Sequence, residues 1–153
     1  MNSYNDGEVV YSKADYATPY VGGLVGSTWG GADIQNSVNL GSVGIESGAE
    51  PSESAIKCLG ALIGYQQVTS ITKYSYYPQS ILNGKAMGAN GAAAGATVQG
   101  FDEEFKFSTV VTYDSVDYTE AVSALNAWVT GESESINYLS WTLGANGPEL
   151  VFE

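Results

Sequence analysis

Two glycine-framed apolar motifs constrain the fold of this chain more than any other feature. Residues 20–26 read YVGGLVG, and residues 58–64 read CLGALIG. Alignment of Gly22–Gly26 with Gly60–Gly64 sets one offset between the two copies. Neighbouring apolar residues in a strand face opposite sides, and flanking glycines permit tight corners. This pattern is typical of a repeat architecture, in which each copy buries its apolar residues against the next one.

The similarity between the two copies extends beyond the glycine motif. With one loop residue deleted, Ile34 falls opposite Ile71. The first copy ends in the pattern N-x-G-x-V at Asn39–Val43, and the same pattern occurs at Asn5–Val9. We therefore expect that the chain opens on the tail of an earlier repeat and is a fragment of a longer array.

The repeats predict a mainly β fold with the form of a β-solenoid, or β-helix, of stacked short strands. One domain over residues 1–153 is expected, because this length can bury one core. Within it, residues 1–79 hold the repeats, 80–107 form a Gly/Ala-rich loop, and 108–153 form a helix and a hairpin. Residues 44–57, which contain three glutamates and one proline, read as an exposed insertion between the copies.

The C-terminal part has a different pattern from the repeats. Residues Tyr118–Val129 carry apolar side chains at helical spacing and predict one α-helix. Ile136–Leu143 and Leu150–Phe152 predict two strands around a glycine-containing turn. We expect this helix and hairpin to form a cap that closes the open end of the solenoid.

Composition excludes several classes of function. The chain has 17 acidic and 5 basic residues, a net charge of −12, and no histidine. The negative charge repels phosphate backbones and anionic lipid, and no apolar run approaches the length of a membrane span, so nucleic acid and membrane insertion are not expected. Without histidine, Ser-His or Cys-His catalysis and imidazole zinc sites are excluded, and we expect no cofactor and no metal. Cys58 is the single cysteine and reads as a buried structural thiol.

Exposed aromatic residues are the candidate ligand-binding positions. Trp29 lies in a polar loop after the first motif, and Tyr74, Tyr76 and Tyr77 form a row after the second. Alternation along a strand places Tyr74 and Tyr76 on one face and Tyr77 on the other. Such rings could stack on sugars or anchor a protein partner. The alternative is that the tyrosines cover the end of the core.

Carboxylates supply the only enzyme hypothesis. Residues 102–104 are all acidic, and Asp114 and Asp117 lie three residues apart. A glycosidase needs two carboxyl groups that face each other across a cleft, about 5–10 Å apart. These acids instead read as solvated turn residues, and no DxDxDG pattern supports a calcium site. We therefore expect no catalytic residues.

The first copy resembles the GLUG repeat of bacterial surface and secreted proteins. The resemblance rests on Gly23–Gly26 with its Gly-Leu-apolar-Gly core, on Ile34 and Asn36, and on Asn39–Val43. The second copy retains Ala61–Gly64 but loses the Asn-rich ending. The tail is similar to the segment that closes such arrays at Phe101–Phe105, Leu125–Val129, Trp141 and Gly147–Leu150.

This resemblance implies an extracellular setting, at the bacterial cell surface or secreted, in adhesin-like proteins. The expected function is a non-catalytic module for adhesion or for binding a glycan or a host or cell-surface protein, beside neighbouring repeats of a parent protein. One alternative is a structural stalk or capping unit with no ligand. Another is a fragment of a carboxylate-based, glycan-active enzyme.

Overall fold

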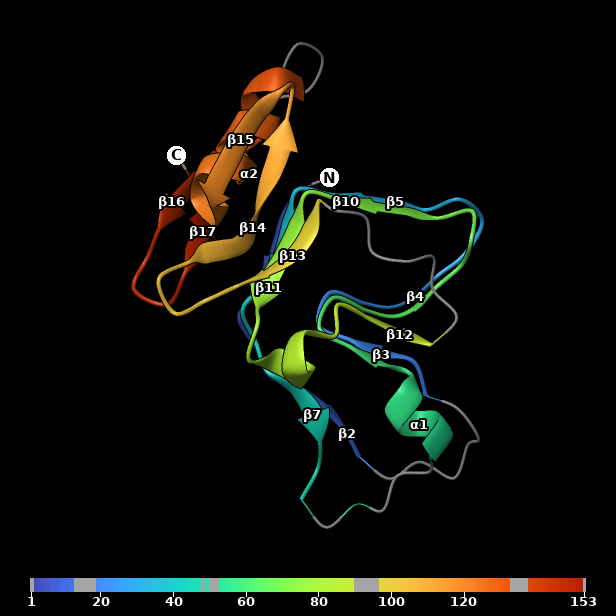
Figure 1. Cartoon of the computed structure of the whole chain (residues 1–153). Helices are drawn as coiled ribbons and strands as arrows, with labels where there is room; N and C mark the ends of the chain where they lie inside the picture. The colour runs from blue at the N-terminus through green and yellow to red at the C-terminus, as the bar shows by residue number, and fades with distance from the viewer. Residues whose placement is uncertain are drawn as a thin grey trace.

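Short strands dominate the computed structural model, which describes residues 2–12, 19–47, 49, 53–89, 97–132 and 138–152 (Figure 1). The mainly β prediction is confirmed, with one long helix and a terminal hairpin. Most strands of the repeats pair in parallel with the equivalent strand of the next copy. The glycine motif itself spans two strands and the bend between them.

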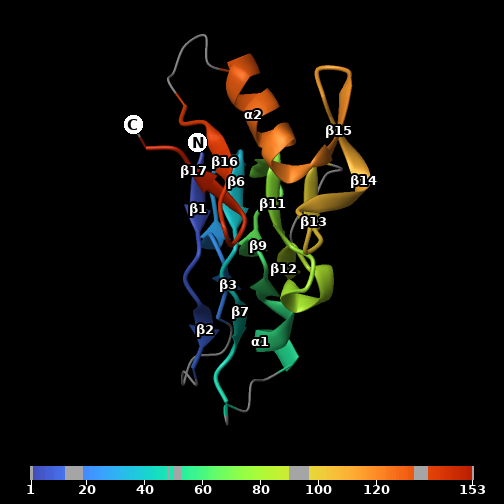
Figure 2. The same ribbon diagram turned by 90° about the vertical axis from the view of Figure 1, so that its left-hand side faces the viewer.

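The largest sheet has four parallel strands followed by two antiparallel ones, and we call it the central sheet. Its strands, in spatial order, are β1 (Ser3–Asn5), β6 (Ser37–Asn39), β11 (Ser75–Pro78), β13 (Val98–Phe101), β14 (Lys106–Tyr113) and β15 (Val116–Glu120). Figure 2 shows the four parallel strands side by side. Each comes from a successive pass of the chain.

Smaller parallel ladders complete the repeats. They consist of β4 (Val25–Thr28), β9 (Ile63–Gln66) and β12 (Met87–Ala89); β5 (Asp33–Gln35) and β10 (Ile71–Lys73); β3 (Val21–Gly22) and β8 (Leu59–Gly60); and β2 (Val9–Tyr11) and β7 (Val43–Ile45). Figure 1 shows these strands lying nearly over one another.

The pairing confirms the alignment of the two glycine motifs. Val25 pairs with Ile63 at the offset that the alignment of the motifs sets, and Val38 pairs with Tyr76 at the same offset. Ladders β3–β8 and β5–β10 keep this offset. The two copies therefore match along their whole length.

The expected loop deletion is wrong. Ile71 pairs with Asp33, and Ile34 pairs with Thr72, so the register is unbroken. Ile34 is buried whereas Ile71 is exposed. The reason is that successive side chains of a strand face opposite sides, so an apolar residue one position away from another faces solvent.

The two N-x-G-x-V patterns also lie in register, with Asn5 beside Asn39. The side-chain amide of Asn5 donates to Oδ1 of Asn39 at 2.8 Å. Asn39, which is fully buried, in turn donates to the backbone carbonyls of Gly41 and Ala61, both at 2.8 Å. This amide ladder satisfies buried polar groups and ties three successive passes of the chain together.

The prediction of a continuous loop over residues 80–107 is wrong in part. This region contains a short 3-10 segment, η1 (Ile81–Gly84), and strands β12 and β13. Met87 pairs with Ile63, and Leu62 N–H donates to the Ala86 carbonyl at 2.9 Å. Residues 84–88 therefore form a third, eroded copy of the glycine motif, closer along the chain to the second copy than the second is to the first. Residues 90–96 lie outside the described residues.

Backbone crowding explains the glycines of the motif. At Gly64, a Cβ atom would lie against Val21 N and 2.6 Å from the Gly26 carbonyl oxygen. At Gly60, it would lie against the Ile63 carbonyl and 2.7 Å from the backbone nitrogen of Gly88 in the third copy. These neighbours are backbone atoms that cannot rotate away. The motif therefore needs glycine for close approach of two chain segments.

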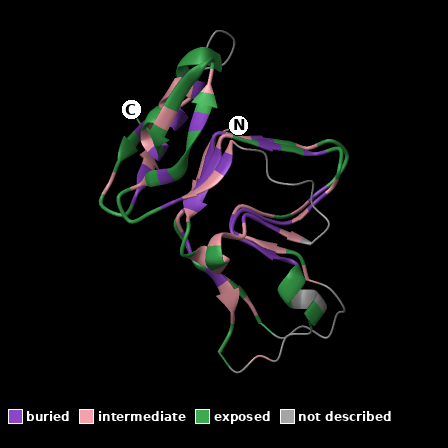
Figure 3. Ribbon diagram, viewed as in Figure 1, coloured by how far each residue is buried: buried purple, intermediate pink, exposed green. Residues whose placement is uncertain are grey.

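The parallel strands of the central sheet have a separate hydrophobic core on each face. Figure 3 shows buried residues concentrated in these strands. The repeat core lies on the side of the smaller ladders and consists of Ile34, Ala61, Leu62, Ile63, Tyr77, Ala86, Met87 and Val98. The outer core consists of Val38, Tyr76, Phe101, Phe107, Val111, Ala121, Ala124, Leu125, Trp128, Val129 and Trp141. Strands β6 and β11 of the sheet are therefore buried on both faces.

The outer core forms beneath a layer made of α2 (Ala121–Glu132) and the hairpin of β16 (Trp141–Leu143) and β17 (Pro148–Leu150). We call these elements and β14–β15 the C-terminal layer. Figure 1 shows this layer, in orange and red, beside the parallel strands. The expected cap over the open end is thus corrected in position: β14 extends the end of the sheet, while α2 and the hairpin cover its side.

Polar contacts fix the C-terminal layer to the repeats. Asn36 is fully buried and adopts a left-handed backbone, with φ of 51°. With its amide oriented to satisfy both partners, it donates to the Leu125 carbonyl and accepts from Trp141 Nε1, both at 3.1 Å. Trp128 Nε1 donates to Gln35 Oε1 at 3.2 Å. Both contacts join α2 or β16 to the corner between β5 and β6.

Several predicted boundaries shift for identifiable reasons. The helix begins at Ala121 and not at Tyr118, because the preceding residues pair with β14 as part of β15. The last strand begins at Pro148, since Leu150 pairs with Trp141. The predicted strand over Ile136–Leu143 is described only from residue 138, and β16 covers its last three residues. The predicted exposed insertion contains a short helix, α1 (Glu53–Lys57).

Tyr76→Phe is expected to stabilise the protein. The Tyr76 ring is fully buried against Phe107, at a centroid distance of 4.7 Å. Its hydroxyl has no hydrogen-bond partner among the described residues. Removal of an unsatisfied buried hydroxyl should raise the free energy of unfolding by about 1 kcal/mol. Urea unfolding at pH 7 measures this change, and a decrease would show that the hydroxyl is satisfied.

The same variant should also resist alkali better. Burial raises the pKa of Tyr76 far above its ordinary value of 10.0. Above about pH 10 the unfolded tyrosine ionises while the folded one stays neutral, so wild-type stability falls as the pH rises. Tyr76→Phe removes this part of the loss. Urea unfolding at pH 8 and pH 11 should show a smaller decrease for the variant.

Candidate functional site

Trp29 lies in the loop between β4 and β5, and this loop has a defined backbone. Gly30 and Gly31 follow it with φ of 67° and 79°, in the left-handed region that favours glycine. The N–H of Gly30 donates to Oε1 of Gln67 at 2.7 Å. Gln67 N–H lies 3.3 Å from both the carbonyl and the hydroxyl oxygen of Thr28. The loop of the first copy is thus fixed to the corresponding loop of the second.

Three rings from the two copies stack beside this loop. The Tyr65 ring lies 4.9 Å from Tyr20 and 5.4 Å from Trp29 between centroids, with interplanar angles of 37° and 31°. Tyr65 is on β9, and pairing of β9 with β4 places it beside Ser27. We call Tyr20, Tyr65 and Trp29 the aromatic stack. Its rings support one another and still reach the surface.

Exposure is greatest at Trp29, where it reaches 60%, and Tyr20 is 39% exposed. Trp29 Nε1 donates to the Ser27 hydroxyl at 3.3 Å, which orients the indole. The sequence pointed to Trp29 but missed Tyr20 and Tyr65. The offset between the two copies contained the signal, because it places Tyr65 opposite Ser27, close to Trp29 in the chain.

The expected exposed tyrosine row is corrected. Tyr76 and Tyr77 are buried, in the outer core and the repeat core respectively, and burial raises the pKa of both. The Tyr77 hydroxyl donates to the Gly84 carbonyl at 2.6 Å. Tyr74 is half-buried and packs edge-on against Tyr113 at 5.2 Å. Tyr76 and Tyr77 are buried because their strand, β11, is covered on both faces. They therefore offer no surface for a ligand.

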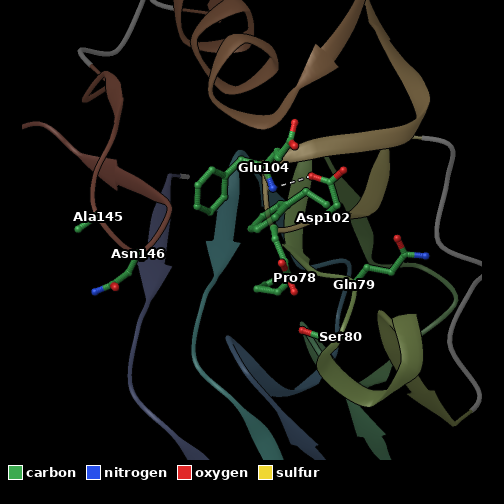
Figure 4. A pocket seen from close by; sticks show the side chains of 10 residues that line it. Pro78, Gln79, Ser80, Asp102, Glu104, Ala145 and Asn146 are labelled. Atoms are coloured by element: carbon green, nitrogen blue, oxygen red, sulfur yellow. Dashed lines mark hydrogen bonds between the residues drawn. The ribbon is translucent and has the colours of Figure 1, made fainter.

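A separate pocket of about 810 Å³ lies between the β13–β14 turn, the end of β11 and the β16–β17 turn (Figure 4). Asp102, Glu103 and Glu104 line one wall. Asp102 Oδ1 accepts from the N–H groups of Glu104 and Lys106, both at 2.9 Å. Lys106 Nζ contacts Glu104 at 2.6 Å, and this hydrogen bond raises the pKa of Lys106.

These carboxylates do not form the facing pair that a glycosidase requires. All three belong to one turn, and the other walls are formed by Pro78, Gln79, Ser80, Ala145 and Asn146, with two phenylalanines. Asp117 accepts from Thr112 at 2.7 Å within the β14–β15 hairpin. In the described part of the chain, no three or more Cys, Asp or Glu side chains come together as a metal site.

Comparison with known proteins identifies one motif. Residues 17–44 match a family model described as the GLUG motif. The match extends into β7 and includes Tyr20 and Trp29 of the aromatic stack. Comparisons with curated proteins and with solved structures gave no match. Across the described segments, no helix has the length and apolar character needed to cross a membrane.

Proposed function

For a chain that carries a GLUG motif, we propose the function of a non-catalytic binding module in a bacterial cell-surface or secreted protein. The module recognises a glycan or a protein through the aromatic stack. The motif and the resemblance of the repeats to adhesin-like proteins support the extracellular setting. The net charge of −12 argues against nucleic acid and anionic membranes as partners.

The scaffold of this module is a β-solenoid. The constant offset between paired residues in four ladders supports this architecture, as does the repeat core that successive copies share. Among the described residues, β4 pairs on one edge only, with β9. Its other edge could receive a neighbouring repeat of a parent protein through the same parallel pairing.

The observation that carries the proposal is the exposed, supported indole of Trp29. Isolated apolar residues on a surface are common, but Trp29 stacks on Tyr65 and sits on a loop that hydrogen bonds fix. A rigid aromatic group loses little conformational freedom on binding, so more of its contact energy appears as affinity. Tryptophan and tyrosine are correspondingly enriched among residues that dominate binding energy.

A non-catalytic role is favoured over a carboxylate enzyme. The pocket acids share one wall, and the carboxylates of Asp102 and Asp117 hold turn or hairpin geometry. The competing proposal is a structural unit with no ligand, and it makes the opposite prediction for the aromatic stack.

Trp29→Ala is expected to abolish detectable binding on a glycan array or to isolated cell surfaces while the fold persists. Loss of one exposed ring contact should lower the free energy of unfolding by about 1 kcal/mol or less. Leu143→Ala is the matched control, because Leu143 is 56% exposed on the far hairpin. Equal binding by Trp29→Ala and wild type would remove the stack as the site. No binding by either protein would favour the structural unit.

A further inference from the structure

We infer that the outer face of the Trp29 indole is a subsite for an uncharged saccharide ring. This inference rests on the proposed function and narrows its ligand from glycan or protein to a neutral glycan. Gln67 acts as the positioning residue. Four features of the described residues carry the inference. They are the arrangement of the rings, the contacts of the Trp29 loop, the charge of the two neighbouring loops, and the interrupted apolar surface around the rings.

The ring arrangement offers a flat face and not a cage. Tyr65 contacts both Tyr20 and Trp29, and these ring pairs are tilted by 37° and 31°, well short of the perpendicular walls of a cage. Recognition of a quaternary ammonium uses aromatic faces that surround the cation. A stacked indole instead presents one electron-rich face, and the C–H groups on one side of a pyranose ring carry the complementary partial positive charge.

The loop contacts hold this face before a ligand arrives. Gln67 Oε1 accepts from the Gly30 N–H at 2.7 Å, and the Ser27 hydroxyl accepts from Trp29 Nε1. Gly30 and Gly31 are both exposed, so the backbone that follows the indole is open to solvent. Bare peptide groups can exchange hydrogen bonds with sugar hydroxyls. A preorganised loop reduces the ordering cost of binding.

The local charge disfavours anionic sugars. Neither residues 27–33 nor residues 65–71 contain lysine or arginine, and Asp33 lies at the end of the first loop. A sulfate, carboxylate or phosphate group would meet no cation in these two loops and would approach a protein of net charge −12. An uncharged saccharide has no such barrier.

Polar residues and glycines interrupt the apolar surface around the rings, whereas a protein partner needs a continuous one. A stable protein interface buries about 800 Å² on each side around an apolar centre. Here the rings are bordered by Ser27, Gly30, Gly31 and Gln67, and the neighbouring loop adds Val68, which is 79% exposed. Val68 is therefore a matched control, because it contributes to a hydrophobic protein contact but has no ring for a sugar.

Affinity electrophoresis of the full chain tests the inference. The neutral probes are hydroxyethyl cellulose and galactomannan, and the anionic probes are polygalacturonate and heparin. We expect at least one neutral polysaccharide to retard the wild type, and neither anionic one to do so. Trp29→Ala should weaken binding at least about tenfold, as expected for a dominant aromatic contact. Trp29→Phe should retain part of it, and Val68→Ser should match the wild type.

Gln67 variants test the positioning role. Gln67→Ala should raise the dissociation constant about threefold to tenfold, because the Gly30 N–H loses its acceptor. Gln67→Glu keeps a side-chain acceptor and should restore the affinity. Thermal melting should be similar for both variants, which separates positioning from a general loss of structure.

Several outcomes would overturn the inference. Retardation by the anionic probes alone would do so, as would an equal loss of affinity in Val68→Ser and Trp29→Ala. A protein that neither neutral probe retards can still bind to cell surfaces and lose this binding when those surfaces are treated with trypsin. That result overturns the inference but leaves the proposed function standing. Absence of binding both to the polysaccharides and to cell surfaces rejects both.

Discussion

Gly64→Ala is expected to lower the free energy of unfolding by at least about 3 kcal/mol, at the upper end of overpacking effects. The added methyl group would meet Val21 N, the Gly26 carbonyl oxygen at 2.6 Å and the Tyr20 carbonyl carbon at 2.6 Å. All three are backbone atoms of the adjacent copy. Relief would require separation of two paired segments, which breaks the ladders on both sides.

Gly44→Ala is the matched control for this substitution. Gly44 lies in β7, and a Cβ atom there would have no neighbour within 4 Å. Its free energy of unfolding should stay within about 0.5 kcal/mol of the wild type. Urea unfolding followed by tryptophan fluorescence measures both variants. Similar small effects would show that the motif glycines are not required by close backbone approach.

Leu62→Asp is expected to unfold the protein at room temperature. Leu62 is fully buried in the repeat core, and an unpaired carboxylate there costs several kcal/mol, comparable to the total stability of a domain. Leu24 occupies the equivalent position of the first copy but is only half-buried. Leu24→Asp should therefore destabilise less and leave a folded, lower-melting protein.

Circular dichroism melts of the two variants, beside Val68→Asp, form the test. Val68 is 79% exposed, so its substitution should leave the melting temperature nearly unchanged. A Leu62→Asp protein that melts like the wild type would contradict a shared core between the copies. A larger fall in melting temperature for Leu24→Asp than for Leu62→Asp would show that Leu24, and not Leu62, is the better-buried residue.

The sequence predicted the repeat register because the physical constraint is local. Close backbone contact demands glycine, so Gly60 and Gly64 recur in the sequence at a fixed distance from the glycines of the first motif. The third copy could not be recognised from the sequence for two reasons. It follows the second motif at a shorter interval than the second follows the first, and Ala86 and Met87 replace the strongly apolar pair. This segment has a strand conformation because it pairs with β9.

The fate of the tyrosines could not be predicted from strand alternation. Alternation does separate Tyr76 from Tyr77, and they lie in different cores. The burial of Tyr76 depends on α2 and the terminal hairpin, which lie far from it along the chain, whereas Tyr77 is buried by residues of the repeats. Similarly, the aromatic stack joins Tyr20 to Tyr65 across two copies. Non-local packing of this kind requires the register and the topology together.

The shortening of the third copy gives the array a direction. The second pass from one glycine motif to the next omits a counterpart of β7 and α1 and uses the short η1 segment instead. The second pass is consequently shorter than the first. A further copy of the first pass, stacked on this end, would find no partner strand for its segment equivalent to β7. In addition, β14 already runs antiparallel to β13. Stacking of a further copy on this side would therefore leave backbone groups of that segment without hydrogen-bond partners.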